Sequence, residues 1–324
     1  MSRSLKAHLL LVLVTMIWGC TFPMIKAALA DSSPLMLNAV RMTLAAVLLA
    51  IYYRKNLRSL TRTGFFTGAL VGLFLGLGYA FQTAGLRLTT PSKSAFLTGI
   101  STVLVPLVLV VFWRAKIHRW RVAGILLALT GLFLMTVPAG RQALADFANI
   151  NSGDLLTIGC AFAFAFQIVF LGRSTRRFPF EQMAVLQIGI GALLTAISAP
   201  FLEHPYFRPT PTVIATVLIT GIFGTAVAFT VQAWAQQFTP ATHAALIFNL
   251  EPVFAWITSF IFLHERLGLR AGAGALLILA GILISEVLGR VNQGRVNQGS
   301  ANQEAAMAPD PDLAAEPGQA SPDG

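Results

Sequence analysis

Long apolar runs dominate this chain, and short polar or basic clusters separate one run from the next. A helix needs about 20 apolar residues to cross the hydrocarbon core of a bilayer, and most of the runs are close to that length. We therefore predict an all-α integral membrane protein with ten transmembrane helices. Their expected bounds are roughly 8–28, 34–53, 64–86, 92–113, a fifth helix that ends by 138, and then 154–172, 181–202, 212–235, 243–263 and 271–289.

The composition supports a membrane environment. Hydrophobic residues make up 56% of the 324 residues, and charged residues only 11%. A net charge of +10 would suggest nucleic acid as a partner of a soluble protein. Here the basic residues lie in short clusters between apolar runs, which is the pattern that orients helices in a bilayer. We predict that the chain is embedded in a lipid bilayer and binds no nucleic acid.

The basic clusters also predict the orientation. With the N-terminus inside, the inner segments hold fifteen Lys and Arg residues and the outer segments hold six. Cytoplasmic loops carry such an excess, so both termini are expected in the cytoplasm. Lys26 and Lys93 are expected near the outer face, where their side chains can snorkel to the surface.

The second half of the sequence repeats the first. Residues 123–131 match residues 273–281 at an offset of 150, and each segment carries two glycines seven residues apart. That spacing places both glycines on one helix face and allows close packing. Two further matches occur in the same order, namely Thr90-Pro91 with Thr239-Pro240 at an offset of 149, and Pro106 with Pro252 at an offset of 146.

Ten helices in two copies give five helices per copy. An odd number turns the second copy upside down, and inverted repeats place a transported molecule at their interface, near the middle of the membrane. We predict a first repeat over 1–138, a linker over 139–153 and a second repeat over 154–289. Residues 290–324 are expected to be a disordered cytoplasmic tail, because they include almost no large apolar residues.

Residues 244–256 are the most informative stretch. They are apolar overall, yet Asn249, Glu251 and Pro252 lie within four residues. An ionised carboxylate near the bilayer centre costs at least about 2.5 kcal/mol, so Glu251 must face a partner or a wet cavity. Proline removes a backbone donor and clashes with the preceding turn, which predicts a kink. We expect kinks or gating points at Pro252, Pro106 and Pro23.

Several motifs resemble those of EamA-type transporters of the drug/metabolite transporter superfamily. They are Trp18-Gly19, Arg41, residues 94–99 with Val105-Pro106, residues 250–255, residues 264–267, and Gly274 with Gly281. The resemblance covers the chain up to residue 289. It implies ten helices, two EamA repeats and movement of small metabolites across the bacterial inner membrane, with amino acids, nucleobases, sugars and xenobiotics all open as substrates. Residues 112–116 depart from the family, which more often has a Gly-Glu pair there.

Two charged residues are the main candidates for the substrate site. Glu251 either binds an amine and exchanges a proton, or is held by a neighbouring helix and stabilises the kink. Arg41 either snorkels to the outer surface or lines the cavity, where it binds an anionic group or pairs with Glu251. Its counterpart at an offset of 146 is Gln187, so the two halves differ in charge. We expect helices 1, 2, 3, 4, 6, 8 and 9 to wall the site. The other candidate residues are Trp18, Thr21, Tyr79, Gln82, Gln167, Gln187, Gln232, Asn249 and Trp256.

The remaining function classes lack their motifs. His264-Glu265 has no second histidine four residues later, and no phosphate-binding glycine loop occurs. A channel would need a ring of like groups along its lining, and the sequence shows no such ring. We predict a secondary transporter that moves a small polar or amphipathic metabolite by alternating access, in the direction of export. A channel or uncoupled facilitator is the alternative, and a membrane enzyme is less favoured. No cofactor is expected, while proton coupling and a homodimer stay open.

Overall fold

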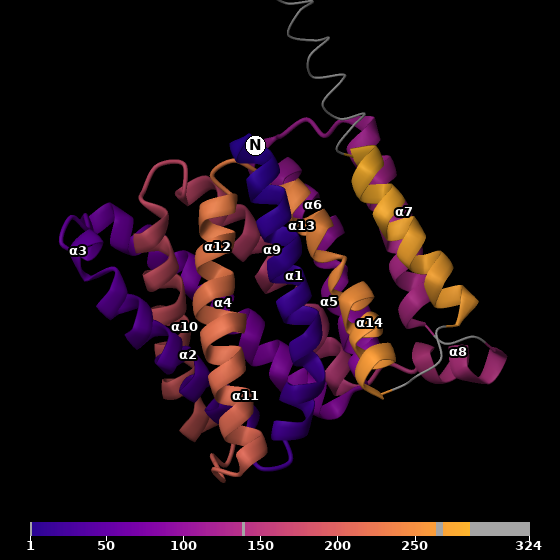
Figure 1. The fold of residues 1–324 in the computed structure, drawn as a ribbon, viewed down its shortest axis with the longest axis horizontal. Coiled ribbons are helices and arrows are strands. Elements are labelled where there is room, and N and C mark those ends of the chain that lie inside the picture. Colours follow the sequence, from indigo (N-terminus) through magenta and orange to yellow (C-terminus); the bar gives the residue numbers. More distant parts are fainter. Residues whose placement is uncertain (1, 138–139, 264–267, 286–324) are drawn as a thin grey trace, which may run out of the picture.

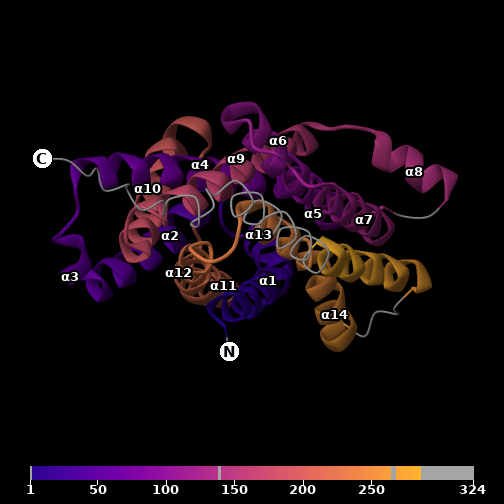
Figure 2. The same ribbon diagram turned by 90° about the horizontal axis from the view of Figure 1, so that it is seen from above.

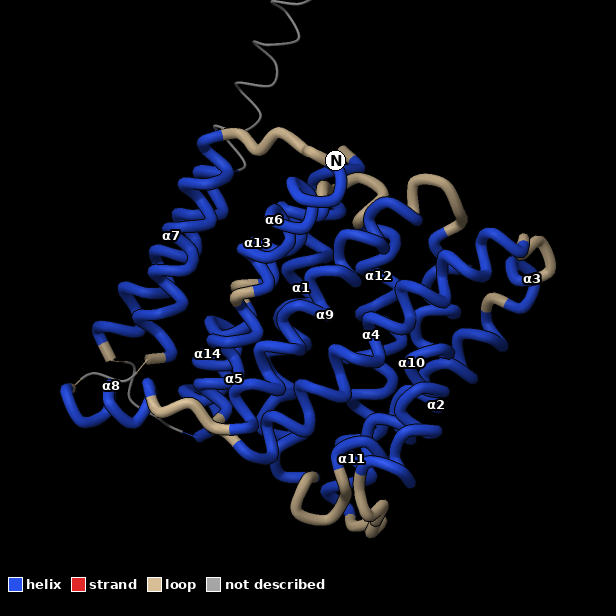
Figure 3. The backbone as a smooth tube through the Cα atoms, turned by 180° about the vertical axis from the view of Figure 1, so that it is seen from behind, coloured by secondary structure: helices blue, strands red, loops and turns tan. Residues whose placement is uncertain are grey.

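The computed structural model describes residues 2–137, 140–263 and 268–285, and within these ranges the chain is helical and contains no β-strand (Figures 1 and 3). The predicted tail and the motif at 264–267 lie outside the described residues. The helices are α1 (Arg3–Ala28), α2 (Pro34–Tyr52), α3 (Arg54–Leu57), α4 (Arg62–Leu88), α5 (Pro91–Gly99), α6 (Ser101–Trp113), α7 (Arg119–Thr136), α8 (Arg141–Ala148), α9 (Ser152–Ser174), α10 (Phe180–Leu202), α11 (Pro211–Gly221), the π-helix η1 (Ile222–Val227), α12 (Ala228–Ala235), α13 (Ala241–Phe248), α14 (Glu251–Leu263) and the helix Leu269–Ser285.

Within the described ranges, eight candidate membrane spans, formed by single helices or by runs of consecutive helices, are long and apolar enough to cross a membrane. Large apolar side chains on their outer surface are exposed; Phe66 is 70% exposed and Phe201 is 81% exposed. Lipid is the solvent that tolerates such surfaces. The structure therefore confirms an all-helical membrane protein. The ninth and tenth predicted spans correspond to α13 with α14 and to the shorter helix Leu269–Ser285, so the count of ten stays a prediction.

Local sequence explains where several helices begin. Three of them start with a hydroxyl residue followed by proline, at Ser33-Pro34, Thr90-Pro91 and Thr210-Pro211. Proline fits the first position of a helix, because its missing donor is not needed there, and a hydroxyl can cap the free backbone groups. The linker predicted over 139–153 also contains a helix, α8, which ends just before the capping box that starts α9.

The glycine pairs found in the sequence face each other. A Cβ atom on Gly124 would lie 2.5 Å from the carbonyl oxygen of Gly281, and one on Gly131 would lie 2.4 Å from that of Gly274. The contact is reciprocal, since Cβ atoms on Gly274 and Gly281 would each lie 2.5 Å from the opposite glycine carbonyl. Helices α7 and Leu269–Ser285 therefore run side by side and antiparallel (Figure 2). An antiparallel contact between equivalent segments is the geometry of an inverted repeat.

Both repeats also contain an interrupted helix at equivalent positions. The chain leaves the α-helix at Ile100, between α5 and α6, and again at Asn249 and Leu250, between α13 and α14 (Figure 3). The break in the second repeat precedes Pro252, which is the second residue of α14 and fits that position for the reason given above. In the first repeat the break lies six residues before Pro106, and α1 continues without interruption through Pro23.

Two lysines differ from the expectation that they snorkel. The side chain of Lys93 is buried, and its Nζ lies 2.6 Å from the Oδ2 of Asp154. Lys26 donates to the backbone carbonyls of Leu86 and Thr89. Both cations bind protein groups instead of reaching for the surface, because carboxylate or carbonyl oxygens lie within their reach.

Candidate functional site

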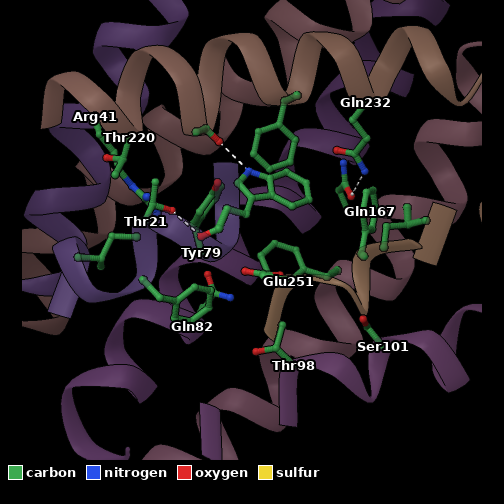
Figure 4. Close-up of a pocket in the computed structure, with 18 residues that line it drawn as sticks. Thr21, Arg41, Tyr79, Gln82, Thr98, Ser101, Gln167, Thr220, Gln232 and Glu251 are labelled. Carbon is green, nitrogen blue, oxygen red and sulfur yellow. Dashed lines mark hydrogen bonds between the residues drawn. The ribbon is translucent and has the colours of Figure 1, made fainter. Parts of the chain in front are cut away.

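A cavity lies among the helices and gives water molecules about 70 Å³ of space for their centres, enough for several waters at roughly 10–15 Å³ each. It is lined from α1, α2, α4, α5, α6, α9, the α11–η1–α12 segment, α13 and α14, which are the seven predicted helices (Figure 4). The lining residues are Trp18, Thr21, Phe22, Ile25, Arg41, Tyr79, Gln82, Thr98, Ser101, Phe164, Gln167, Ile168, Thr220, Gly224, Phe229, Gln232, Phe248 and Glu251.

Arg41 supplies a positive charge to the cavity wall. Only 2% of the residue is exposed, so the side chain does not snorkel to the surface. Its Nε donates to the Oδ1 of Asn38 at 3.0 Å, and its guanidinium carbon lies 4.2 Å from the centre of the Tyr79 ring. Its Nη2 is buried and has no hydrogen-bond partner among the described residues. A fixed guanidinium with an unused donor is suited to binding an anionic group.

Asn38 holds Arg41 in place. It donates through Nδ2 to the carbonyl oxygen of Tyr79 and to the Oγ1 of Thr83, both at 3.0 Å. Thr83 in turn donates to the Oδ1 of Asn38 at 3.2 Å. The Asn38 side chain is fully buried, and both its Nδ2 and its Oδ1 form hydrogen bonds. The Arg41 guanidinium, which donates to this fixed Oδ1, therefore has little freedom to rotate.

Glu251 supplies a negative charge at another wall. It is the first residue of α14, directly after the helix break, and it is half-buried. Within the described residues its carboxylate makes no hydrogen bond and no ion pair, so it does not pair with Arg41. Figure 4 shows the two side chains at separate positions around the cavity. The N-terminus of a helix favours a negative charge, so this position suits an acidic residue.

The tryptophan of α1 ties the cavity to a π-helix. Trp18 donates from Nε1 to the carbonyl oxygen of Gly224 at 2.8 Å, and Gly224 lies within η1. π-Helical turns leave backbone carbonyls outside the regular α-helical pattern and occur often at functional sites. Thr21, one turn further along α1, donates to the carbonyl oxygen of Trp18 at 2.8 Å.

Three glutamines form a chain beside the cavity. Gln167 donates to the Oε1 of Gln187 at 2.9 Å and accepts from Gln232 at 3.4 Å. Gln187 is fully buried behind this layer and does not line the cavity, so its predicted contact with a substrate has no support here. The Oε1 of Gln232 is buried and unpartnered among the described residues, which leaves one acceptor facing the site.

Two other predicted residues lie outside the main cavity. Trp256 packs against the hydrophobic cluster that includes Leu132 and Ile278. Asn249 lines a smaller cavity of about 30 Å³ that Glu251 also borders. Its Oδ1 accepts from Thr102 at 2.9 Å, and its Nδ2 is buried without a partner among the described residues. The predicted roles of Trp256 and Asn249 as direct substrate ligands stay predictions.

The sequence interpretation missed the aromatic wall. Phe22, Phe164, Phe229 and Phe248 all line the cavity, and Trp18 packs against two of them with ring centroids 5.2 Å away. Phenylalanine is common in membrane helices, so composition gives no reason to select these four. The repeat offset was the available signal, because it relates Phe164 to Trp18 and Phe229 to Tyr79.

The repeat relates most of the cavity lining. An offset of 146 connects residues of α1 with residues of α9, and an offset of 150 connects the later helices. Seven pairs result, and both members of each pair line the cavity. They are Trp18 with Phe164, Thr21 with Gln167, Phe22 with Ile168, Tyr79 with Phe229, Gln82 with Gln232, Thr98 with Phe248, and Ser101 with Glu251. Pro106 and Pro252, matched at 146 in the sequence, are therefore not counterparts in the structure, because α6 begins at Ser101 and α14 at Glu251.

The site offers no cluster for a metal ion. Among residues 2–137, 140–263 and 268–285, no group of three or more His, Cys, Asp or Glu side chains could hold one. The polar groups at the cavity are instead one guanidinium, one carboxylate, amides and hydroxyls. Such a set can bind and release a small polar molecule through charge and hydrogen bonds.

Comparison with known proteins gives consistent results. Residues 5–137 and 151–286 each match the model of the EamA-like transporter family. An uncharacterized transporter of Archaeoglobus fulgidus is 34% identical over 87% of this chain and 86% of its own length. A probable amino-acid metabolite efflux pump of Salmonella typhimurium is 25% identical over 88% of this chain and 95% of its own length.

A solved crystal structure shares the fold. Its TM-score is 0.71 at 18% sequence identity, and the alignment covers 89% of this chain and 99% of the other. At this identity the likeness concerns the fold alone. The family match extends over most of the sequence and occurs once in each half, which agrees with the paired glycines and paired helix breaks. The chain belongs to the EamA-like transporter family, with the EamA domain present twice.

Proposed function

We propose that this protein is a secondary carrier that moves a small zwitterionic metabolite, of the amino acid type, by alternating access. The observation that carries the proposal is the presence of Arg41 and Glu251 at separate positions of one cavity, without an ion pair between them. A buried cation and a half-buried anion that do not neutralise each other each require a partner of opposite charge. A zwitterion provides both partners in one molecule.

The remaining lining favours an apolar or aromatic group on the cargo. Four phenylalanines and Trp18 surround the charged pair, and aromatic faces also attract an ammonium group. In this arrangement the cargo carboxylate binds the unpartnered Nη2 of Arg41, and its ammonium group binds Glu251. The name of the Salmonella relative, a probable amino-acid metabolite efflux pump, agrees with this chemistry.

We further propose export across a bacterial inner membrane, with both termini in the cytoplasm. The excess of basic residues on the segments expected on the same side of the membrane as the N-terminus supports the orientation. Two inverted five-helix halves provide a route for alternating access, because one half can rock against the other around a fixed site. The reciprocal glycine contact between α7 and Leu269–Ser285 supports that relation between the halves.

Proteoliposomes test the substrate class. Vesicles are loaded with an unlabelled apolar amino acid, and uptake of the labelled compound is followed as counterflow. The methyl ester of the same amino acid lacks the carboxylate, and the N-acetyl form lacks the ammonium group. We expect saturable counterflow with the free amino acid and little with either derivative. If a derivative is transported as well as the free amino acid, the corresponding charge contact is not part of recognition. Non-saturating conductance would indicate the channel alternative.

Proton coupling is a separate part of the proposal and depends on Glu251. A half-buried carboxylate without a protein partner can take up a proton when the cargo leaves. An imposed pH gradient across the vesicle membrane should then change the rate of net transport. If the rate ignores the gradient while counterflow persists, the protein exchanges its cargo without protons.

A further inference from the structure

A buried ion pair connects the two repeats at one membrane face. Lys93 lies near the start of α5, and its Nζ is 2.6 Å from the Oδ2 of Asp154, near the start of α9. Thr89 donates to the other carboxylate oxygen at 2.7 Å, and Lys93 also donates to the carbonyl of Asn149 at 2.7 Å. We call this side of the molecule the Asp154 face. The contact joins α5 of the first repeat to α9 of the second.

Two histidines connect the repeats at the opposite face. His8 lies in the first turns of α1 and His243 lies in the first turn of α13, and the centres of their rings are 4.9 Å apart with an angle of 22° between the planes. We call this side the N-terminal face. The contact again joins the two repeats, since α1 belongs to the first and α13 to the second.

The two contacts are counterparts of each other. Lys93 corresponds to His243 at the offset of 150, and Asp154 corresponds to His8 at the offset of 146. These are the same offsets that pair the cavity residues. Thr239, which the sequence repeat matches with Thr90 at an offset of 149, lies at an offset of 150 from Thr89, and its Oγ1 is buried without a hydrogen-bond partner among the described residues. The fold therefore places one contact at each face. One contact is an ion pair, and the other is a pair of stacked histidine rings.

We propose that Lys93 with Asp154 and His8 with His243 are the two gates that close the cavity alternately at its two faces. The inference rests on the proposed carrier function, because a channel needs no alternation. When one repeat rocks against the other, the helix ends separate at one face and stay together at the other. A contact between helix ends that separate at a face must break whenever that face opens. The two contacts meet this condition at opposite faces.

The local role of Asp154 does not explain the ion pair. Asp154 forms the capping box of α9, because its carboxylate accepts from the backbone of Asn151 at 2.9 Å and its own backbone donates to the Asn151 side chain at 3.0 Å. A cap of this kind needs no lysine. Lys93 adds a contact between repeats that capping does not require, and the burial of both charges makes their separation sensitive to water entry.

A cysteine reporter in the cavity tests the gates without knowledge of the cargo. Ser101→Cys is introduced into a chain in which Cys20 and Cys160, the two native cysteines, are replaced by alanine. A membrane-impermeant thiol reagent is applied to one face of the membrane or to the other, and the ratio of the two labelling rates is measured. This ratio reports which face of the cavity is open.

The two gates should shift this ratio in opposite directions. Lys93→Met with Asp154→Asn removes both charges and should favour labelling from the Asp154 face. His8→Ala with His243→Ala should favour labelling from the N-terminal face. We expect changes of about fivefold or more, the size typical of coupling between distant sites. Lys26→Met is the matched control, because Lys26 bonds at the Asp154 face but only within the first repeat, and it should leave the ratio unchanged.

An unchanged ratio, or a shift in the same direction for both double variants, would overturn the gate assignment. If the Lys93 and Asp154 double variant does not reach the membrane, Lys93→Arg keeps the charge but changes the geometry, and it should shift the ratio in the same direction. A different result would contradict the proposed carrier function. Opposite shifts without any counterflow of a zwitterion would keep the gates and remove the substrate class.

Discussion

The two repeats build equivalent walls around one cavity but supply them with different charges. Where the second repeat has Glu251, the first has Ser101, and both side chains line the cavity. Where the first repeat has Arg41, the second has Gln187, which is buried behind the lining. The repeats agree in backbone course, helix breaks and glycine packing. They disagree at the groups that would recognise a cargo.

This difference separates two tasks of the molecule. The symmetry of the fold provides equivalent helix ends at the two faces, which is the requirement for alternating access. The asymmetry of the side chains provides recognition, because a cation and a carboxylate at separate positions select for one orientation of a zwitterion. Each repeat contributes one of the two charges, so a bound zwitterion would also hold the repeats together.

Removal of either charge should have the largest effect. In the proteoliposome assay, Arg41→Gln and Glu251→Gln each remove one charged contact with the cargo, worth about 1.5–3 kcal/mol, which corresponds to roughly a 10- to 100-fold loss of apparent affinity. Counterflow of the free amino acid measures the loss. The derivative that lacks the matching group should be least affected, namely the methyl ester for Arg41→Gln and the N-acetyl form for Glu251→Gln.

A control variant separates recognition from folding. Gln187→Leu changes the counterpart of Arg41 behind the lining and should affect counterflow less than Arg41→Gln does. If Gln187→Leu and Arg41→Gln impair counterflow equally, the asymmetry between the repeats is not the basis of recognition.

The sequence predicted the coarse plan because that plan follows from strong physical signals. Long apolar runs predict membrane helices wherever the chain folds, and the glycine pair in each half predicted the close contact between α7 and Leu269–Ser285. A carboxylate in an apolar run must face a cavity or a partner, which led to Glu251. The seven helices that line the cavity were predicted on the same grounds.

Finer features depend on contacts that a single sequence does not show. The break in the first repeat lies at Ile100, directly after the single Gly99, and not at Pro106. Lys93 was expected at the surface because its partner, Asp154, lies 61 residues away in the chain. The phenylalanine wall could not be selected from 24 phenylalanines without the repeat offset.

Relocation of the charges sharpens the comparison between repeats. In a Glu251→Ser background, Ser101→Glu returns a carboxylate to the cavity from the other repeat, because both positions line it. We expect partial recovery of counterflow. In an Arg41→Gln background, Gln187→Arg should give no recovery, since that position is fully buried behind the lining. Recovery in both cases would show that the two repeats are interchangeable, against the comparison made above.

The residue that orients Arg41 should have a smaller effect than Arg41 itself. Asn38→Ala removes the acceptor of the Arg41 Nε and leaves the Thr83 hydroxyl without that partner. Loss of one hydrogen bond to a charged group, about 1.5 kcal/mol, predicts roughly a tenfold weaker apparent affinity for the free amino acid. The methyl ester should be little affected by Asn38→Ala, because it makes no contact with Arg41. Equal losses for both compounds would indicate a general packing defect.

The glycine contacts are where the repeats should behave alike. Gly131→Ala places a Cβ 2.4 Å from the Gly274 carbonyl oxygen, and its counterpart Gly281→Ala places one 2.5 Å from that of Gly124. Overpacking of this kind destabilises by about 1–3 kcal/mol, against a gain of roughly 1 kcal/mol in helix propensity. Thermal unfolding of the purified protein should therefore show similar small decreases in Tm for both. Gly189→Ala is the control, because no atom beyond its chain neighbours and the backbone of its own helix lies within 4 Å of its Cβ position, and it should leave Tm unchanged or raise it. A decrease in only one of the two counterparts would show that the asymmetry extends from recognition into the packing of the scaffold.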